Sequence, residues 1–153
     1  MANSYTQLYI QIVFPVKSRA RLILPSWKER LHRYITGIVQ AKRHKMLQIH
    51  CMPDHAHIFI GMKPHEAISD LVRDLKRDSS AFINQNGLAG GRFSWQDGFG
   101  AFSYSHRDIP NVIKYIQNQV IHHGQSTFEE EYLELLKRYE VEYNPKYIFD
   151  PLE

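Results

Sequence analysis

The chain has 153 residues, enough for one domain with a sizeable core, and its 43% hydrophobic and 23% charged residues are an ordinary globular balance. Its single cysteine, Cys51, excludes an internal disulfide and a cysteine-rich zinc module, and it suits a reducing compartment. No apolar run approaches the roughly 18 residues of a membrane-spanning helix, and the polar N-terminus has no signal-peptide pattern. We therefore expect a cytoplasmic protein that makes no membrane contact.

The charge is distributed unevenly along the chain. Residues 1–126 hold 16 Lys and Arg against 8 Asp and Glu, whereas residues 127–153 hold 3 against 8. A basic body attracts phosphate backbones, but solvated helix faces also carry Lys and Arg. Charge alone therefore leaves a nucleic-acid partner open.

The first third of the chain predicts a strand, a helix and a hairpin. Apolar residues alternate over residues 5–15, which is typical of a strand. A capping box of Ser26 and Glu29 predicts the start of a helix, which runs to the basic cluster at residues 42–45. Two further strands are expected at residues 46–52, burying Leu47, Ile49 and Cys51, and at 55–62, joined by a turn at Pro53 and Asp54.

The second strand of this hairpin carries two histidines at alternate positions. Because successive side chains of a strand point to opposite faces, His55 and His57 share one face, while Ala56, Ile58 and Ile60 share the other. Two imidazoles held side by side can supply two ligands of a metal site with open positions. The plainer interpretation is two polar histidines on the wet face of an edge strand.

The rest of the chain predicts mainly helices. Tyr115, Gln119 and His122 fall at i, i+4 and i+7 of one predicted helix and so share a stripe. Taken alone, Tyr115 is a half-buried helix residue and Gln119 a surface amide. The elements expected are helices at residues 65–86 and 108–123, a strand within residues 93–105, and a last helix from Ser126 or Thr127 with capping-box glutamates.

Two other groups of residues have a functional and a plain interpretation. Arg73, Lys76 and Arg77 make a basic helix face that either tracks phosphates or is simply solvated. Trp95 and Phe102 either stack on unpaired bases or pack in the core, and core packing is favoured.

The order of the elements predicts an α+β fold, an antiparallel sheet with helices packed on it. We expect one domain over residues 1–153, with the acidic C-terminal tail, about residues 140–153, laid on its surface.

Several segments together resemble the single-tyrosine HUH transposases of the insertion-sequence 200/605 group, including relatives that act on repeated extragenic palindromes. HUH denotes two histidines on either side of a bulky apolar residue. The resemblance covers nearly the whole chain and implies a ferredoxin-like sheet of the HUH type. Two residues depart from the family's pattern. Asp54 stands where these transposases usually have Asn, and Ala56, between the two histidines, is small for that position. The matching segments are residues 52–57, Trp95 with Gln96, residues 115–119, and His122 with His123.

The resemblance implies cleavage and joining of single-stranded DNA. Tyr115 would attack the scissile phosphate and form a 5′-phosphotyrosine bond, while His55, His57 and Gln119 would hold Mg²⁺ or Mn²⁺. His122 would be a further neighbour of the active site. The family further implies a homodimer, in which the tyrosine helix of one chain completes the histidine site of the other, and a single-stranded DNA substrate with hairpins at the element ends.

Two other functions remain open from the sequence. A basic α+β domain of this kind can bind hairpin nucleic acid without cutting it, as a non-catalytic or domesticated relative. A structural zinc site of Cys51, His55, His57 and His123 ranks last, because Cys51 is expected to point into the core.

Overall fold

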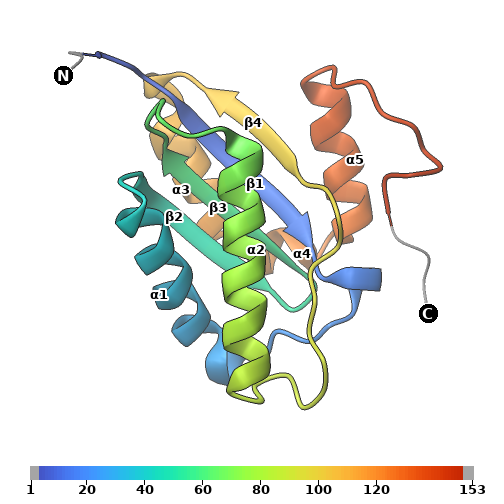
Figure 1. Ribbon diagram of the computed structural model, residues 1–153. Coiled ribbons are helices and arrows are strands. Elements are labelled where there is room, and N and C mark those ends of the chain that lie inside the picture. Colours follow the sequence, from blue (N-terminus) through green and yellow to red (C-terminus); the bar gives the residue numbers. More distant parts are fainter. Residues whose placement is uncertain (1–3, 150–153) are drawn as a thin grey trace.

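The computed structural model describes residues 4–149, and of His122 it describes the backbone alone. Its four strands form one antiparallel sheet in the order β2-β3-β1-β4 (Figure 1). The elements, in chain order, are β1 (Tyr9–Pro15), η1 (Lys17–Arg19), α1 (Pro25–Ala41), β2 (Lys45–Met52), β3 (His55–Gly61), α2 (Ile68–Gln85), β4 (Gly100–Tyr104), η2 (His106–Asp108), α3 (Ile109–Gln117), α4 (Gln119–His123) and α5 (Phe128–Arg138).

The helices lie on both faces of the sheet. The order β1-α1-β2-β3-α2-β4 is the ferredoxin-like arrangement, and it places α1 and α2 together on one face (Figure 1). The other face is covered by α3 below β3 and by α5 below β1 and β4. The predicted α+β class with an antiparallel sheet is confirmed. Within residues 4–149, no helix is long and apolar enough to cross a membrane.

The alternation of side chains on β3 divides the two faces as predicted. Ala56, Ile58 and Ile60 are fully buried in the large core under α1 and α2. Phe59 points the other way and packs with residues of α3. His55 and His57 share the face of Phe59, and both are 0% exposed. The wet edge-strand interpretation is wrong, because β3 lies between β2 and β1 and helices cover its second face.

A bulge changes the pattern expected for β2. The register shifts between Met46 and Gln48, so that Leu47 packs on the α3 side. Ile49 and Cys51 face the core under α1 and α2. Of the three residues predicted to be buried, Cys51 is fully buried and Leu47 and Ile49 are half-buried, and the bulge places Leu47 on the opposite face from the other two.

Two strands are shorter than predicted. β1 begins at Tyr9 rather than at residue 5, because its pairing with Gly61 of β3 and Tyr104 of β4 ends there. β4 begins only at Gly100, although Trp95 makes an isolated bridge to β1's neighbour Val16.

The helix starts and stops also differ in part. Pro25 is the first residue of α1, whose N-cap, Leu24, makes no side-chain cap, so the capping box at residues 26–29 is wrong. The helix expected over residues 108–123 breaks at Asn118 into α3 and α4. The last helix follows prediction: Thr127 caps α5 in a capping box with Glu130.

The described part of the C-terminal segment follows α5. Tyr143, Ile148 and Phe149 pack against the core of α5, and the Ile148 carbonyl accepts a hydrogen bond from Gln96. Residues 150–153 lie outside the described residues.

Candidate active site

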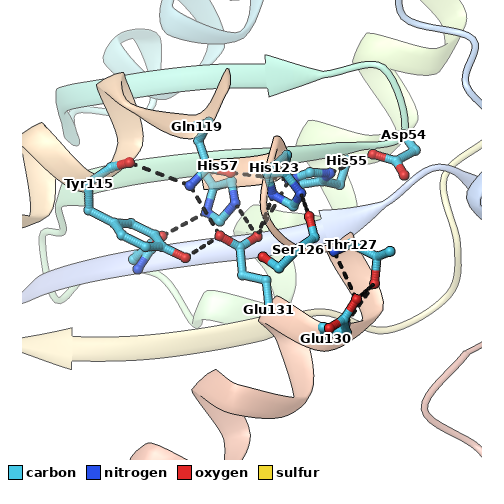
Figure 2. A network of polar contacts seen from close by, with 11 residues as sticks. Asp54, His55, His57, Tyr115, Gln119, His123, Ser126, Thr127, Glu130 and Glu131 are labelled. Atoms are coloured by element: carbon cyan, nitrogen blue, oxygen red, sulfur yellow. Dashed lines mark hydrogen bonds and ion pairs between the residues drawn. The ribbon is translucent and has the colours of Figure 1, made fainter. Parts of the chain in front are cut away.

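The two histidines of β3 lie side by side beneath α4 and α5. Their ring centroids are 5.0 Å apart, and the ring of His123 from α4 lies 4.6 Å from that of His55. β3 is paired with a strand on each side, which fixes the backbone at His55 and His57. Both imidazoles therefore project from the same face of the sheet. Three imidazoles are thus brought into one buried space (Figure 2).

Each of these three imidazoles has an oxygen acceptor at Nδ1. Such a contact orients the ring and directs its Nε2 toward the centre of the site. The pairs are His55 with Asp54 Oδ1 at 2.7 Å, His57 with Gln11 Oε1 at 2.8 Å, and His123 with the Ser126 carbonyl at 3.1 Å.

Glu131 of α5 lies where the three Nε2 atoms meet. Its Oε1 is 3.0 Å from His123 Nε2, 3.1 Å from His57 Nε2 and 3.6 Å from His55 Nε2. The Glu131 side chain is only 2% exposed. One ligand atom from each of these four residues lies within 4.8 Å of the others, and a set of imidazoles with a carboxylate can hold a divalent metal ion.

The second oxygen of Glu131 contacts the tyrosine helix. The Tyr115 hydroxyl donates a hydrogen bond to Oε2, and the Gln119 amide donates to the same oxygen at 3.1 Å (Figure 2). Gln119 Oε1 lies 3.4 Å from His55 Nε2. Tyr115 and Gln119 therefore approach the histidines from one side, although the helix breaks between them, and they do so within a single chain.

Burial and neighbouring charges oppose each other in setting the pKa of Glu131, but they act in the same direction on the pKa of Tyr115. Burial tends to raise the pKa of Glu131, but hydrogen bonds from His123 and His57 outweigh it and hold that pKa far below its usual range. Burial and the neighbouring Glu131 carboxylate raise the pKa of Tyr115 well above its usual value. The tyrosine is therefore held as a neutral phenol with a defined acceptor for its proton.

Burial and neighbouring charges also set the pKa values of His55, Asp54 and His123. Burial lowers the pKa of His55 to about 4, against the opposing hydrogen bond to Asp54. Burial also acts to raise the pKa of Asp54, but the His55 contact reverses it and the pKa is lowered. His123 is less buried, and Glu131 outweighs desolvation and raises its pKa.

Two cavities flank the cluster. One, of about 380 Å³, is lined by Tyr115, Gln11 and Arg138 among others, and it lies on the tyrosine side. The other, of about 610 Å³, is lined by Asp54, His123 and other residues of the segment before α5. Tyr115 and His123 therefore each border a hollow in the surface.

The structure brings together four of the five site residues proposed from sequence: His55, His57, Tyr115 and Gln119. The side chain of His122 lies outside the described residues, and its role stays a prediction. Cys51 points to the opposite face of the sheet and is fully buried there, so it takes no part in a zinc site with the histidines.

Sequence reasoning missed Glu131, although a signal was present. Phe128, Tyr132, Leu135 and Leu136 form the buried stripe of α5, and Glu131 falls on the same stripe. A carboxylate is rarely buried unless it is paired or bound to a metal, so an acidic residue at such a position marks a site.

The basic residues of α2 and the aromatic residues Trp95 and Phe102 make contacts within the fold. Arg73 and Arg77 are exposed and form ion pairs with Asp74 of the same helix. Lys76 donates to the carbonyls of Gln96 and Gly98 rather than facing solvent. Trp95 and Phe102 are confirmed as core residues, at 6% and 3% exposure.

The fold and the site together define a class: α+β proteins that bring a His-x-His strand and a helix-borne tyrosine into one buried centre. The family described as transposase IS200 like matches residues 4–119, and the chain belongs to this family of DNA transposases. The resemblance to the insertion-sequence 200/605 group is confirmed. His123 and Glu131 lie beyond the matched segment.

Known proteins agree with this assignment. The chain is 25% identical over 119 residues to the ISDra2 transposase TnpA of Deinococcus radiodurans, covering 74% of this chain and 84% of the relative. A crystal structure of a Deinococcus radiodurans R1 protein assigned to the transposases matches with a TM-score of 0.58 and 20% identity, covering 78% of this chain and 96% of that one. A REP-associated tyrosine transposase bound to a REP hairpin matches with a TM-score of 0.60 and 17% identity, covering 81% and 73%.

Proposed function

We propose that this protein is a metal-dependent transposase that cleaves and rejoins single-stranded DNA through a covalent bond between Tyr115 and a 5′-phosphate. The observation that carries the proposal is the meeting of Tyr115, Gln119 and the His55–His57 pair at one carboxylate, Glu131. A nucleophile and metal-ligating groups are thus available at a single phosphate-sized position. Belonging to a transposase family makes DNA the substrate class.

The proposed chemistry needs few groups. The Tyr115 oxygen attacks phosphorus, the bond from phosphorus to the 3′-oxygen breaks, and the phenol proton passes toward Glu131 Oε2, to which it is already donated. The departing 3′-oxygen takes up a proton and becomes a 3′-hydroxyl. Reversal with another 3′-hydroxyl rejoins the strand and frees the tyrosine.

The residues that would hold the divalent ion, Mg²⁺ or Mn²⁺, are His55, His57 and Gln119. The ion would supply positive charge to the scissile phosphate and its departing oxygen. Their chemistry fits such an ion, since two buried Nε2 atoms and the Gln119 carbonyl oxygen face one another. Positive charge there would also offset the effect of Glu131 on Tyr115, whose pKa burial and that carboxylate raise.

The proposed substrate is single-stranded DNA with hairpins. A relative of the same fold was solved bound to a REP hairpin, and this supports a hairpin ligand here. The net charge of +8 over residues 1–126 (16 minus 8) suits a phosphate backbone.

The decisive experiment incubates the protein with an end-labelled single-stranded hairpin oligonucleotide and Mn²⁺ or a chelator, and reads a denaturing gel. We expect a metal-dependent band retarded by the mass of the protein, absent in Tyr115→Phe. Tyr147→Phe is the matched control, because Tyr147 is 72% exposed and lines a different cavity from Tyr115. An adduct that persists in Tyr115→Phe would remove Tyr115 from the role of nucleophile.

The proposed homodimer has a separate test. In the family arrangement the tyrosine acts across the dimer, whereas here Tyr115 lies beside His57 of its own chain, with ring centroids 5.9 Å apart. Mixing Tyr115→Phe with His57→Ala restores adduct formation if the site is shared between chains. No restoration, with each variant binding DNA, shows a site completed within one chain.

One observation favours a second function, hairpin binding without cleavage. The pKa of Tyr115 is raised by burial and by Glu131, which opposes formation of the nucleophilic phenolate. A non-catalytic relative would bind hairpins with salt-dependent affinity that is indifferent to metal and to His57→Ala. Chelator-sensitive cleavage excludes it.

A further inference from the structure

We propose that His123 and Glu131 bind the metal ion together with His55 and His57, so that the centre has three imidazole ligands and one carboxylate besides the Gln119 oxygen. This inference rests on the proposed function, which assigns the ion to His55, His57 and Gln119. It adds two ligands, one from α4 and one from α5. Both lie after residues 4–119, the segment that matches the family.

The first support is convergence. Glu131 Oε1 lies 3.0 Å from His123 Nε2 and 3.1 Å from His57 Nε2, so His123 is as close to the centre as a residue of the HUH strand. One ligand atom from each of the four residues lies within 4.8 Å of the rest. An ion with ligands at about 2.0–2.2 Å draws such atoms together with small side-chain movements.

The second support is the hydrogen bonding at the far side of each ring. The acceptors at Nδ1 are a carboxylate, an amide oxygen and a backbone carbonyl, from Asp54, Gln11 and Ser126. Each of these contacts needs a proton on Nδ1, and a neutral imidazole has only one. In the metal-bound form each ring would keep its proton on Nδ1, and the three Nε2 atoms, which lie 3.0, 3.1 and 3.6 Å from Glu131 Oε1, would coordinate the ion.

The third support is that Glu131 has one oxygen for each task. Oε2 accepts hydrogen bonds from Tyr115 and Gln119, while Oε1 faces the three imidazoles. A carboxylate in this position connects the ion directly to the nucleophile. Gln119 then holds Glu131 in place through its amide group and keeps its own oxygen toward His55.

The donor set predicts which ions bind tightly. Three imidazoles suit Mn²⁺ and Zn²⁺ better than Mg²⁺, which prefers oxygen ligands and keeps several waters. We therefore expect Mn²⁺ and Zn²⁺ to bind the DNA-free protein more tightly than Mg²⁺ does.

The test measures Mn²⁺ binding to the full chain by calorimetry, without DNA. Loss of a residue that only orients a metal ligand typically weakens metal binding about 10–100-fold. Loss of a ligand itself should weaken it no less, so we expect Glu131→Gln and His123→Asn each to weaken Mn²⁺ binding at least about tenfold. Glu134→Gln and His106→Asn are matched controls, since Glu134 pairs with exposed Arg138 and His106 hydrogen-bonds Tyr9 at the surface. Wild-type affinity in both Glu131→Gln and His123→Asn would overturn the inference.

A second measurement uses the unaltered chain, so it does not depend on the folding of a variant. Nitrogen-15 NMR of the zinc-loaded protein reads the protonation and metallation of each histidine ring. We expect metal-bound Nε2 and protonated Nδ1 at His55, His57 and His123. Metal-bound signals at His55 and His57 alone contradict the assignment, and so do signals at His44 and His65 instead, which form a second candidate group of ligands with Glu66.

The two proposals fail in different ways. If the ligand set is wrong, metal affinity is unchanged in the variants while Tyr115 still forms its DNA adduct. If the proposed function is wrong, no adduct forms on hairpin DNA although the metal binds with these ligands.

Discussion

Asp54 determines which nitrogen His55 offers to the centre. Its carboxylate accepts from His55 Nδ1 at 2.7 Å, and this leaves Nε2 directed at Gln119 and Glu131. Asp54 is also the last residue of the turn before β3, so one residue links the start of the strand to the orientation of its first imidazole.

We predict that Asp54→Ala weakens Mn²⁺ binding about 10–100-fold, because the ring loses the acceptor that orients it. Asp54→Asn keeps an oxygen acceptor and should lose much less. Calorimetric titration of both variants tests this. Equal affinities of Asp54→Ala and the wild type would show that the turn alone positions His55.

A second histidine supports the sheet rather than the site. His32 of α1 accepts the Cys51 backbone N–H at Nε2, with a distance of 2.8 Å, and so caps the outer edge of β2. Burial lowers the pKa of His32 below 6.5, although Glu29 opposes the shift. A lowered pKa in the folded state means that the unfolded chain takes up the proton first as the pH falls.

The stability contributed by neutral His32 is therefore full above pH 6.5 and is lost as the pH falls from there through its lowered pKa. We predict that the unfolding free energy of the wild type falls more steeply over this range than that of His32→Gln, by at most about 1.4 kcal/mol per pH unit. Urea unfolding at a series of pH values measures both slopes. Parallel curves would show that His32 has the same pKa folded and unfolded.

Sequence reasoning reached the residues that a short, regular pattern defines. His55 and His57 follow from the two-residue period of a strand, and Tyr115 with Gln119 from the four-residue spacing of a helix. Glu131 was out of reach of spacing alone, because its place depends on how α5 packs under β1 and β4. The signal for Glu131 in the sequence was its position, a charged residue on the apolar stripe of α5.

The start of α5 was predicted correctly from the sequence, and the reason is local. Thr127 and Glu130 satisfy each other's backbone groups across the first turn, so their partners are three residues apart in the chain. The bulge in β2 and the break at Asn118 are different, since both depend on contacts with distant elements. Boundaries set by tertiary pairing are invisible in a single segment.

The capping box also bears on the site, because Glu131 follows it directly. We predict that Thr127→Ala lowers the free energy of unfolding by about 1 kcal/mol, since the Glu130 N–H loses its side-chain acceptor. Thr127→Ser keeps the hydroxyl and should stay close to the wild type. Chemical denaturation of the three proteins provides the comparison, and an equal loss in both variants would point to the methyl group instead.

Over the whole molecule, the site lies where the two halves of the chain meet. β3 supplies His55 and His57 from the sheet, while α3, α4 and α5 bring Tyr115, Gln119 and Glu131 from the helical layer behind it (Figure 1). In the DNA-free state this layer is attached to the sheet by the small cores of Phe59 and Val13 and by the polar cluster itself. A metal ion with ligands from β3, α4 and α5 would cross-link the two layers.

We therefore predict that Mn²⁺ stabilises the fold as well as the site. A ligand at 100 times its Kd adds about 2.7 kcal/mol to the folded state. For a chain of this size each kcal/mol is worth roughly 2–4 °C, so the Tm should rise by roughly 5–11 °C over its value with chelator. Circular dichroism melting measures the shift, which Glu134→Gln should keep; Glu131→Gln, if it binds Mn²⁺ at least about tenfold more weakly, should lose about half of the shift or more at the same Mn²⁺ concentration. A full shift in Glu131→Gln would mean that the ion is held by the sheet alone and that α5 docks independently of it.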